Sequence, residues 1–203
     1  HEKIKSGERI TSVVSTVDLA TTVLTIAGLK PRESIQSVSF ATTLLGSKEQ
    51  TRLYAFAEHN WHDYRAFERG VHSQKYCYVR NWLPDTPGTP PADAVKSITY
   101  DEMKRLLAAD MLTPEQSECF LAPREEEFLF DVEADPNCVR NLIDAAKQDE
   151  QLGEELSRLR KALTAWQTAT NDRFPGEEQL TPDGFDRNSG DRIISASHPS
   201  KVK

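Results

Sequence analysis

The residues best suited to chemistry lie together in one polar stretch that follows a short apolar segment. Glu58, His59, Trp61 and His62 all stand within residues 58–64. Imidazoles bind charged oxygens, carboxylates bind hydroxyls, and an indole covers the face of a ring. The stretch is therefore a candidate binding site for a polar, anionic ligand. The alternative, in which the histidines bond to strand ends and Trp61 belongs to the core, stays open at this point.

A metal site is a weaker interpretation of these histidines. No carboxylate or cysteine completes a plausible tetrahedral ligand set with His59, His62 and His72. We therefore expect no metal ligands in this chain. The three cysteines fit no zinc-binding spacing, and the redox compartment cannot be read from them: Cys77, Cys119 and Cys138.

Arg69 is a further candidate binding residue. A guanidinium group can hold an oxyanion through two parallel hydrogen bonds. The alternative is a strand-end arginine that forms an ion pair with Glu68 or Asp63. Both interpretations are open from the sequence.

Composition limits the class of protein. The chain has 203 residues, of which 37% are hydrophobic and 28% charged, and a formal charge of −7. These values fit a folded globular chain and argue against nucleic acid as a partner, because phosphate binding needs a clustered basic face. The longest apolar stretch, 13–29, is interrupted by polar residues, so no membrane span is expected.

Apolar spacing and turn residues predict the elements that would position the candidate site. A helix is expected over 17–27, buried on most sides, and the longest helix over 149–170, where leucines recur every three or four residues. The other expected elements are shorter: a helix at 40–45, a strand at 52–57, two strands within 69–80 around a turn at 73–75, a helix at 99–110 capped by Thr99, a helix beginning at 113, and a strand at 127–132.

These elements predict an α/β architecture. A small antiparallel sheet of about four strands should pack on the long C-terminal helix. We expect three parts: residues 1–57 as the end of a larger domain with a buried helix and strand, residues 58–172 as a subdomain with the sheet and the long helix, and residues 173–203 as an irregular tail.

Three stretches, in order, resemble the sulfatase family, which has the alkaline-phosphatase-like fold. Val14–Gly28, with Ile35–Gly46 after it, is similar to a family helix and the loop that follows. Arg69–Asn81 resembles the family's Arg-x-Val-Arg-Thr hairpin, and Glu127–Leu142 resembles the Asp-Pro strand before its last long helix. The ending Ala162–Asp172 looks like the heparan N-sulfatase (sulfamidase) branch. Thr21 and Thr42 replace family prolines, Ser37 a glycine and Phe130 a tyrosine.

The resemblance implies the C-terminal portion of a hydrolase of sulfate esters or sulfamates on glycosaminoglycan-type sugars such as heparan sulfate, with N-sulfoglucosamine favoured. In such enzymes the nucleophile is a formylglycine made from Cys/Ser-x-Pro-x-Arg, and calcium polarises the sulfate. Both are expected in the full-length enzyme, upstream of this chain, which begins with His1 and shows no signal peptide. Cys119–Arg124 and Ser197–Lys201 resemble the nucleophile motif only by chance. We thus expect no catalytic residue here, and an inactive chain.

What the resemblance leaves to this chain is part of the substrate pocket. It favours substrate binding by Glu58, His59, Trp61, His62 and Arg69. Expected partners are a sulfated sugar and the missing N-terminal sulfatase portion, with a homo-oligomer as a further possibility and neither nucleic acid nor membrane. The family context implies a periplasmic, extracellular or lysosomal location.

Two alternatives to the sulfatase interpretation remain open. One is a non-catalytic truncated sulfatase fragment or interaction module, and the other is a phosphoester hydrolase of the same superfamily. In either case the helix over 17–27 would expose a large apolar patch if no partner covered it, so the isolated chain should be marginally stable or associate.

Overall fold

A computed structural model describes residue 7, residues 9–47 and residues 49–193. The chain forms two compact units. The first comprises residues 1–57, 69–79 and 128–172, and the second comprises residues 58–68, 80–127 and 173–203. Each unit is described by itself below.

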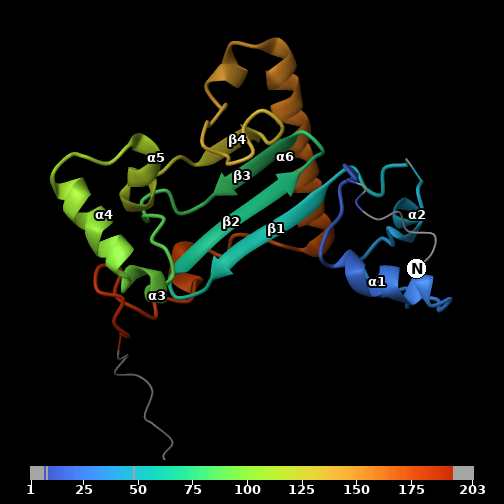
Figure 1. Ribbon diagram of the computed structural model, residues 1–203, viewed down its shortest axis with the longest axis horizontal. Helices are drawn as coiled ribbons and strands as arrows, with labels where there is room; N and C mark the ends of the chain where they lie inside the picture. Colours follow the sequence, from blue (N-terminus) through green and yellow to red (C-terminus); the bar gives the residue numbers. More distant parts are fainter. Residues whose placement is uncertain (1–6, 8, 48, 194–203) are drawn as a thin grey trace, which may run out of the picture. The chain divides into compact units, whose positions relative to one another are not determined.

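A four-stranded sheet with the order β1-β2-β3-β4 is the central feature of the fold (Figure 1). The amide of Ser73 donates to the carbonyl of Tyr76, which closes the β2–β3 hairpin. The amide of Val132 donates to Lys75 and that of Asn81 to Glu126, which is an antiparallel register for β3 and β4. The strands have the following bounds: β1 Ala55–Trp61, β2 Arg65–His72, β3 Tyr76–Asn81 and β4 Glu127–Asp131.

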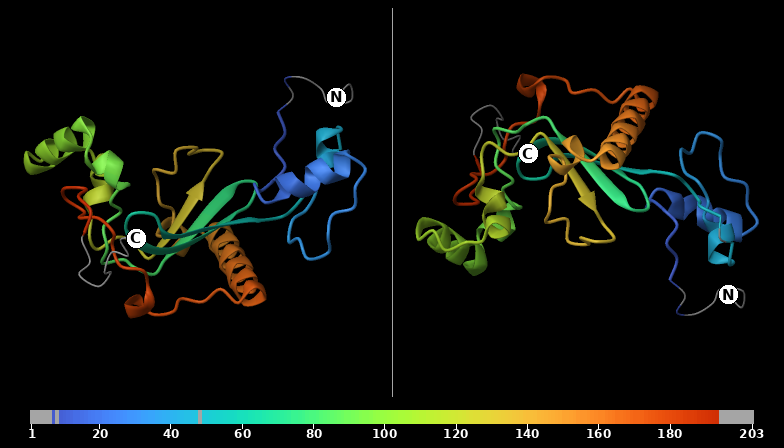
Figure 2. Two further views of the ribbon diagram at one scale, coloured as in Figure 1. Left: turned by 90° about the horizontal axis from the view of Figure 1, so that it is seen from below. Right: turned by 90° about the horizontal axis from the view of Figure 1, so that it is seen from above.

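The long helix α6, Glu150–Thr170, packs on one face of the sheet in the first unit, as Figure 2 shows. Asp149 accepts a hydrogen bond from the amide of Leu152 and so caps its N-terminus, and Asn171 ends it in the left-handed conformation. The core lies between the leucine stripe of α6 and side chains of β2, β3 and β4: Val71, Tyr78, Leu129, Leu156, Leu159 and Leu163. The predicted antiparallel sheet and long helix are confirmed.

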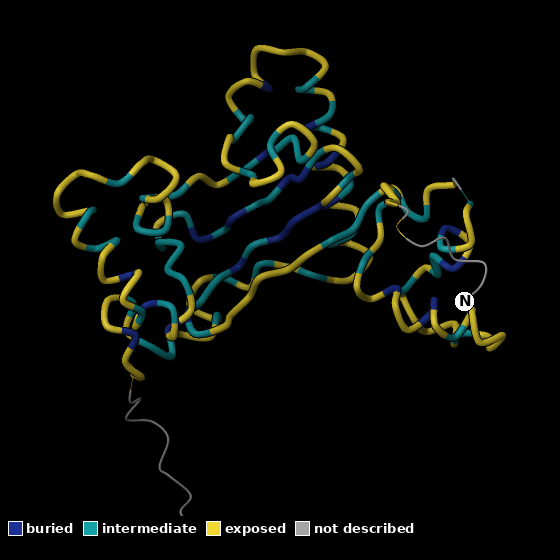
Figure 3. Tube along the Cα trace, viewed as in Figure 1, coloured by how far each residue is buried: buried dark blue, intermediate teal, exposed yellow. Residues whose placement is uncertain are grey.

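Helix α1, Asp18–Ile26, corrects one expectation. Its buried residues are the polar Asp18, Thr21 and Thr22, whereas Val23 is 65% exposed. Figure 3 shows this exposure along α1. The reason is that the first unit holds α1 by polar contacts: the Asp18 carboxylate accepts the amides of Ser15 and Val38 and pairs with Arg52.

Several boundaries also differ from the expected ones. The strand expected at 52–57 begins at Ala55 and continues through the histidine stretch to Trp61, so His59 lies on a strand. The helix α4, Ile98–Ala108, is capped by Ser97, whose hydroxyl accepts from the amide of Tyr100, and not by Thr99. The short helix expected to begin at Thr113 is confirmed, and the structure shows that Thr113 and Gln116 form a capping box there.

The second unit has its own small apolar core. Tyr64, Ala92, Val95 and Tyr100 are buried in it, and Phe185 from the C-terminal segment packs against them. Residues 173–193 therefore take part in this core, while Ser197–Lys201 lies outside the described residues. The remaining helices are short: α2 Ala41–Leu44, α3 Ala92–Val95, α5 Pro114–Ser117 and the 3-10 turns Glu118–Phe120, Ala145–Lys147 and Glu177–Gln179.

Candidate functional site

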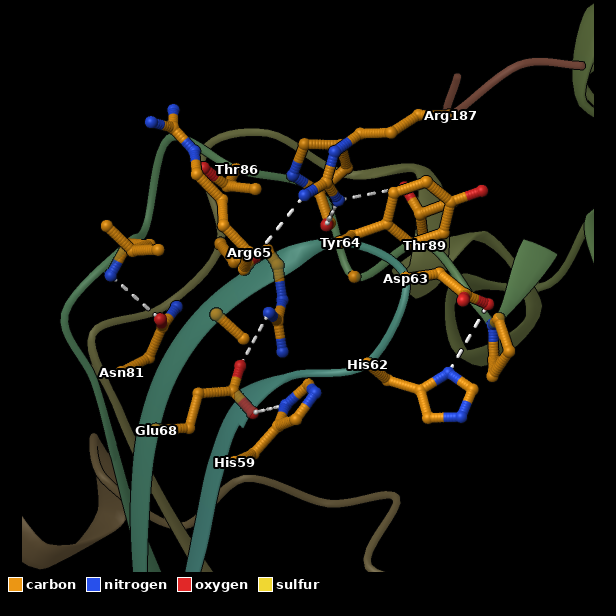
Figure 4. Close-up of a pocket in the computed structure, with 16 residues that line it drawn as sticks. His59, His62, Asp63, Tyr64, Arg65, Glu68, Asn81, Thr86, Thr89 and Arg187 are labelled. Carbon is orange, nitrogen blue, oxygen red and sulfur yellow. Dashed lines mark hydrogen bonds and ion pairs between the residues drawn. The ribbon is translucent and has the colours of Figure 1, made fainter. Parts of the chain in front are cut away.

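A polar cavity of about 240 Å³ lies in the second unit (Figure 4). The turn between β1 and β2, the loop 81–91, Arg124 and Arg187 form its walls. Two of the predicted site residues, His59 and His62, line it. The structure therefore brings imidazole, carboxylate and guanidinium groups to one cavity, which is the side-chain set that binds a polar anionic ligand.

Glu68 joins two cationic or polar groups of this cavity. Its Oε2 lies 3.2 Å from Nδ1 of His59, and its Oε1 accepts a 2.8 Å hydrogen bond from Nη1 of Arg124. Burial alone would raise the pKa of Glu68, but the hydrogen bond from His59 and the charge of Arg124 outweigh it and lower the pKa. Glu68 is therefore an ionised carboxylate at neutral pH.

The charge of Glu68 determines the role of His59. An ionised carboxylate can only accept hydrogen bonds, so Nδ1 of His59 must be the donor. The imidazole is 56% exposed, and its other nitrogen makes no hydrogen bond to the described residues. His59 thus offers Nε2 to a ligand.

His62 is held more loosely. Its Nδ1 lies 3.3 Å from Oδ2 of Asp63, and 71% of its side chain is exposed. The same Asp63 oxygen accepts a 2.7 Å hydrogen bond from the amide of Ala92, which fixes the β1–β2 turn against the start of α3. His62 is therefore more exposed than His59 and is held by fewer contacts.

Arg187 builds the wall of the cavity opposite these histidines. Its Nε and Nη2 donate to both oxygens of Asp183, at 2.6 and 2.9 Å. Its remaining donors reach the carbonyls of Pro87 and Arg65 and the hydroxyl of Thr89. Since a guanidinium has five N–H groups, all of its donors are used, and Arg187 positions the site without a donor left for a ligand.

Arg65 lines the cavity, but its guanidinium is directed away from the histidines. One of its Nη atoms pairs with Glu177 at 2.6 Å. Arg65 and Glu68 stand three positions apart on β2, so their side chains lie on opposite faces of the strand, and Figure 4 shows Arg65 directed away from Glu68, His59 and His62.

The other predicted site residues lie elsewhere. Trp61 donates its Nε1–H to the carbonyl of Pro182, and Glu58 is an exposed strand residue whose Oε2 lies 3.4 Å from the amide nitrogen of Asn60. Arg69 is 2% exposed in the first unit and donates two hydrogen bonds to Asp172, a partner that the sequence did not suggest. None of the three lines the cavity.

Four cavity residues were missed from the sequence: Arg65, Glu68, Arg124 and Arg187. Arg124 and Arg187 come from loops far along the chain, where position cannot be read from periodicity. The segment just before Arg187 contains the turn-forming residues Asp183, Gly184 and Asp186. These residues were the sequence signal that the segment forms a turn.

The calcium that the resemblance implies was expected in the full-length enzyme and not in this chain. The described part contains no group of three or more histidine, cysteine, aspartate or glutamate side chains placed to hold a metal ion. The cysteine of the chance motif, Cys119, has a pKa raised by burial, so its thiol stays protonated at neutral pH. No helix in the described ranges is long and apolar enough to cross a membrane.

Comparison with known proteins identifies relatives. No protein-family model matches the chain. The ulvan-active sulfatase of Formosa agariphila is 34% identical over 173 residues, which are 84% of this chain and 28% of that protein. The solved structures include BT1596, described as a 2-O GAG sulfatase, with a TM-score of 0.54, 18% identity, and coverage of 84% of this chain and 28% of that one.

A second solved structure has the same fold. BT4656, determined in complex with its substrate D-glucosamine-2-N,6-O-disulfate, has a TM-score of 0.56 and 17% identity over 88% of this chain and 28% of that one. The chain thus spans 28% of the length of the relatives it matches. The order of sheet and long helix, the fold likeness and the sequence identity agree. The chain is therefore homologous to sulfatases over the C-terminal part of those proteins.

Proposed function

We propose that this chain is the substrate-binding C-terminal part of a sulfatase that hydrolyses sulfate esters or sulfamates of glycosaminoglycan-type sugars. The observation that carries the proposal is the cavity at His59, which places two exposed imidazoles beside the ion pair of Glu68 and Arg124 in a homologue of sulfatases. The formylglycine nucleophile and calcium belong to the rest of such an enzyme. The chain alone binds sugar without turning it over.

Different side chains of the cavity can bind different groups of a sulfated sugar. His62, whose side chain is 71% exposed, offers a ring N–H to sulfate oxygens. His59 offers a ring nitrogen for a neighbouring polar group of the sugar. The volume of about 240 Å³ suits one sugar ring better than a chain of several.

N-sulfoglucosamine is the sugar we favour. BT4656, which shares the fold, takes a glucosamine that carries both N- and O-sulfate groups. BT1596 is a 2-O sulfatase, so relatives of one fold differ in the sulfate they remove. The identity of the sugar therefore rests on a binding measurement.

Titration of the 203-residue chain with glucosamine N-sulfate by calorimetry or NMR tests the proposal. Glucosamine and inorganic sulfate are the reference ligands. His62→Gln should weaken binding about tenfold or more, the effect of one lost hydrogen bond to a charged group, and Arg140→Gln on the exposed surface of the first unit is the control. Equal binding by both variants, or equal affinity for inorganic sulfate and the sulfated sugar, contradicts the proposal.

The exposed apolar residues of α1 support a second part of the proposal, namely that the rest of a sulfatase covers them. Val17, Leu19 and Val23 are 59%, 54% and 65% exposed, and Leu29 after the helix is 58% exposed. Large exposed apolar surfaces are rare on a free monomer. Since the chain spans 28% of its relatives, the missing portion is the occupant that we propose.

A further inference from the structure

The pair formed by His59 and Glu68 determines which chemical group of a ligand His59 can recognise. A neutral imidazole carries its proton on one nitrogen only, and the other nitrogen is an acceptor. Which nitrogen is protonated depends on the partner of each. In this cavity the partner of Nδ1 is known, because Oε2 of Glu68 lies 3.2 Å away.

Glu68 has little freedom to change its role. Its Oε1 accepts a 2.8 Å hydrogen bond from Arg124, which can only donate. The side chains of Glu68 and Arg124 are 19% and 17% exposed, so this ion pair is largely shielded from water. A carboxylate held in this way remains an acceptor on both oxygens, and Figure 4 shows it joined to the imidazole on one side and to a guanidinium on the other.

We propose that Glu68 is a positioning residue that holds His59 as the Nδ1–H tautomer, so that Nε2 accepts a hydrogen bond from a sugar hydroxyl or amine N–H and does not bind the sulfate. The inference rests on the proposed function, because it names the part of the sugar that His59 contacts. A sulfate oxygen is an acceptor and would face the Nε2 lone pair, which is unfavourable. The sulfate is therefore left to His62, the more exposed imidazole of the cavity.

His62 differs from His59 in this respect. Its Nδ1 lies 3.3 Å from an Asp63 oxygen that already accepts the amide of Ala92, and its ring is 71% exposed. In the described part of the chain, no cation pairs with Asp63 in the way Arg124 pairs with Glu68. We therefore expect His62 to populate both tautomers, and it serves as an internal reference.

Glu68→Gln should reverse the tautomer of His59, which the loss of a merely structural contact would not do. Arg124 can only donate, so the amide oxygen of the new glutamine faces Arg124 and its NH₂ group faces His59. Nδ1 then becomes the acceptor, and the ring proton moves to Nε2. The substitution thus converts the open nitrogen of His59 from an acceptor into a donor with little change in shape.

The ring-nitrogen shifts of the histidines, measured by ¹⁵N NMR on the 203-residue chain at alkaline pH, test the tautomer. The chain has five histidines, so a His59→Gln spectrum assigns the signal. We expect a protonated Nδ1 in the unchanged chain and a protonated Nε2 in Glu68→Gln. Glu126→Gln, which removes a carboxylate paired with Arg80, is the matched control and should leave His59 unchanged. A protonated Nε2 in the unchanged chain overturns the inference.

Binding of O-methyl analogues of glucosamine N-sulfate tests the recognised group. The unchanged chain should lose about tenfold in affinity for the one analogue whose contacted hydroxyl is methylated, because the ether oxygen has no proton to donate to Nε2. Glu68→Gln, whose Nε2–H can donate to that oxygen, should bind this analogue and the parent sugar equally. Equal sensitivity of both proteins to every analogue overturns the assignment of Nε2 to a hydroxyl. If no sugar binds, the proposed function fails, while the nitrogen shifts still decide whether Glu68 fixes the tautomer.

Discussion

Arg69 and Asp172 join the sheet to the end of the long helix. Nε and Nη2 of Arg69 donate to the two carboxylate oxygens of Asp172, each at 2.8 Å. Arg69 lies on β2 and is 2% exposed, and Asp172 follows α6 and also accepts a hydrogen bond from Gln167. The hydrogen bond from Arg69, opposed by burial, lowers the pKa of Asp172 below its ordinary value of 3.8. The pair is a structural clamp of the first unit.

Asp172→Asn should destabilise the first unit by about 3 to 5 kcal/mol, because it leaves a buried guanidinium without its counter-charge. Urea unfolding followed by circular dichroism measures the loss. Asp144→Asn, at an exposed Lys147 pair, is the control and should change stability by less than about 1 kcal/mol. Equal stability of both variants would show that the clamp contributes nothing.

The same clamp has a defined pH dependence. Since the folded pKa of Asp172 is depressed, its stabilisation is fully present above the unfolded pKa and is lost as the pH falls through the folded pKa. The free energy of unfolding should therefore drop below about pH 4, and Asp172→Asn should show a smaller drop over the same range. Parallel pH profiles for the two proteins would contradict this.

Arg187→Lys should loosen the C-terminal wall of the cavity. A lysine ammonium cannot reproduce five donors directed at Asp183, Pro87, Thr89 and Arg65. We expect about a 2 kcal/mol loss and faster limited proteolysis within residues 173–193, with Arg192→Lys as the control. Equal cleavage rates in the two variants would contradict the role of Arg187 in holding the cavity wall.

Elements with a strong local signal were predicted well from the sequence. The leucine period of α6 and the turn at Ser73 depend on neighbours within a few residues, and both match the structure. Which face of α1 is buried could not be predicted in the same way. Its apolar residues suggested burial, but the first unit binds α1 through Asp18, and what covers an apolar face cannot be deduced from the helix alone.

The site was predicted only in part for a related reason. His59 and His62 were found because they stand close together in the sequence. Arg124 and Arg187 reach the same cavity from loops more than fifty residues further on, and only tertiary structure brings them there. Arg69 shows the opposite error, since a binding-type side chain turned out to be a clamp.

The apolar residues on α1 predict how the isolated chain behaves. Because Val17 and Val23 are exposed, the chain should self-associate and bind the dye ANS. Replacing both by glutamate should give a monomer with unchanged unfolding free energy within about 0.5 kcal/mol, as expected for exposed positions. Analytical ultracentrifugation measures association. A chain that is already a dye-negative monomer would contradict the proposal that a partner covers α1.

Cys77 should report opening of the first unit. Burial raises the pKa of its thiol to about 12, with a smaller contribution from Cys138, and its side chain is 5% exposed. A protonated, buried thiol reacts slowly with iodoacetamide, so at pH 8 labelling of Cys77 should require unfolding and should speed up in Asp172→Asn. Mass spectrometry of the labelled peptides measures the labelling rate of Cys77. Cys119 in the second unit is the control, and its labelling rate should be the same in both proteins because Arg69 and Asp172 belong to the first unit.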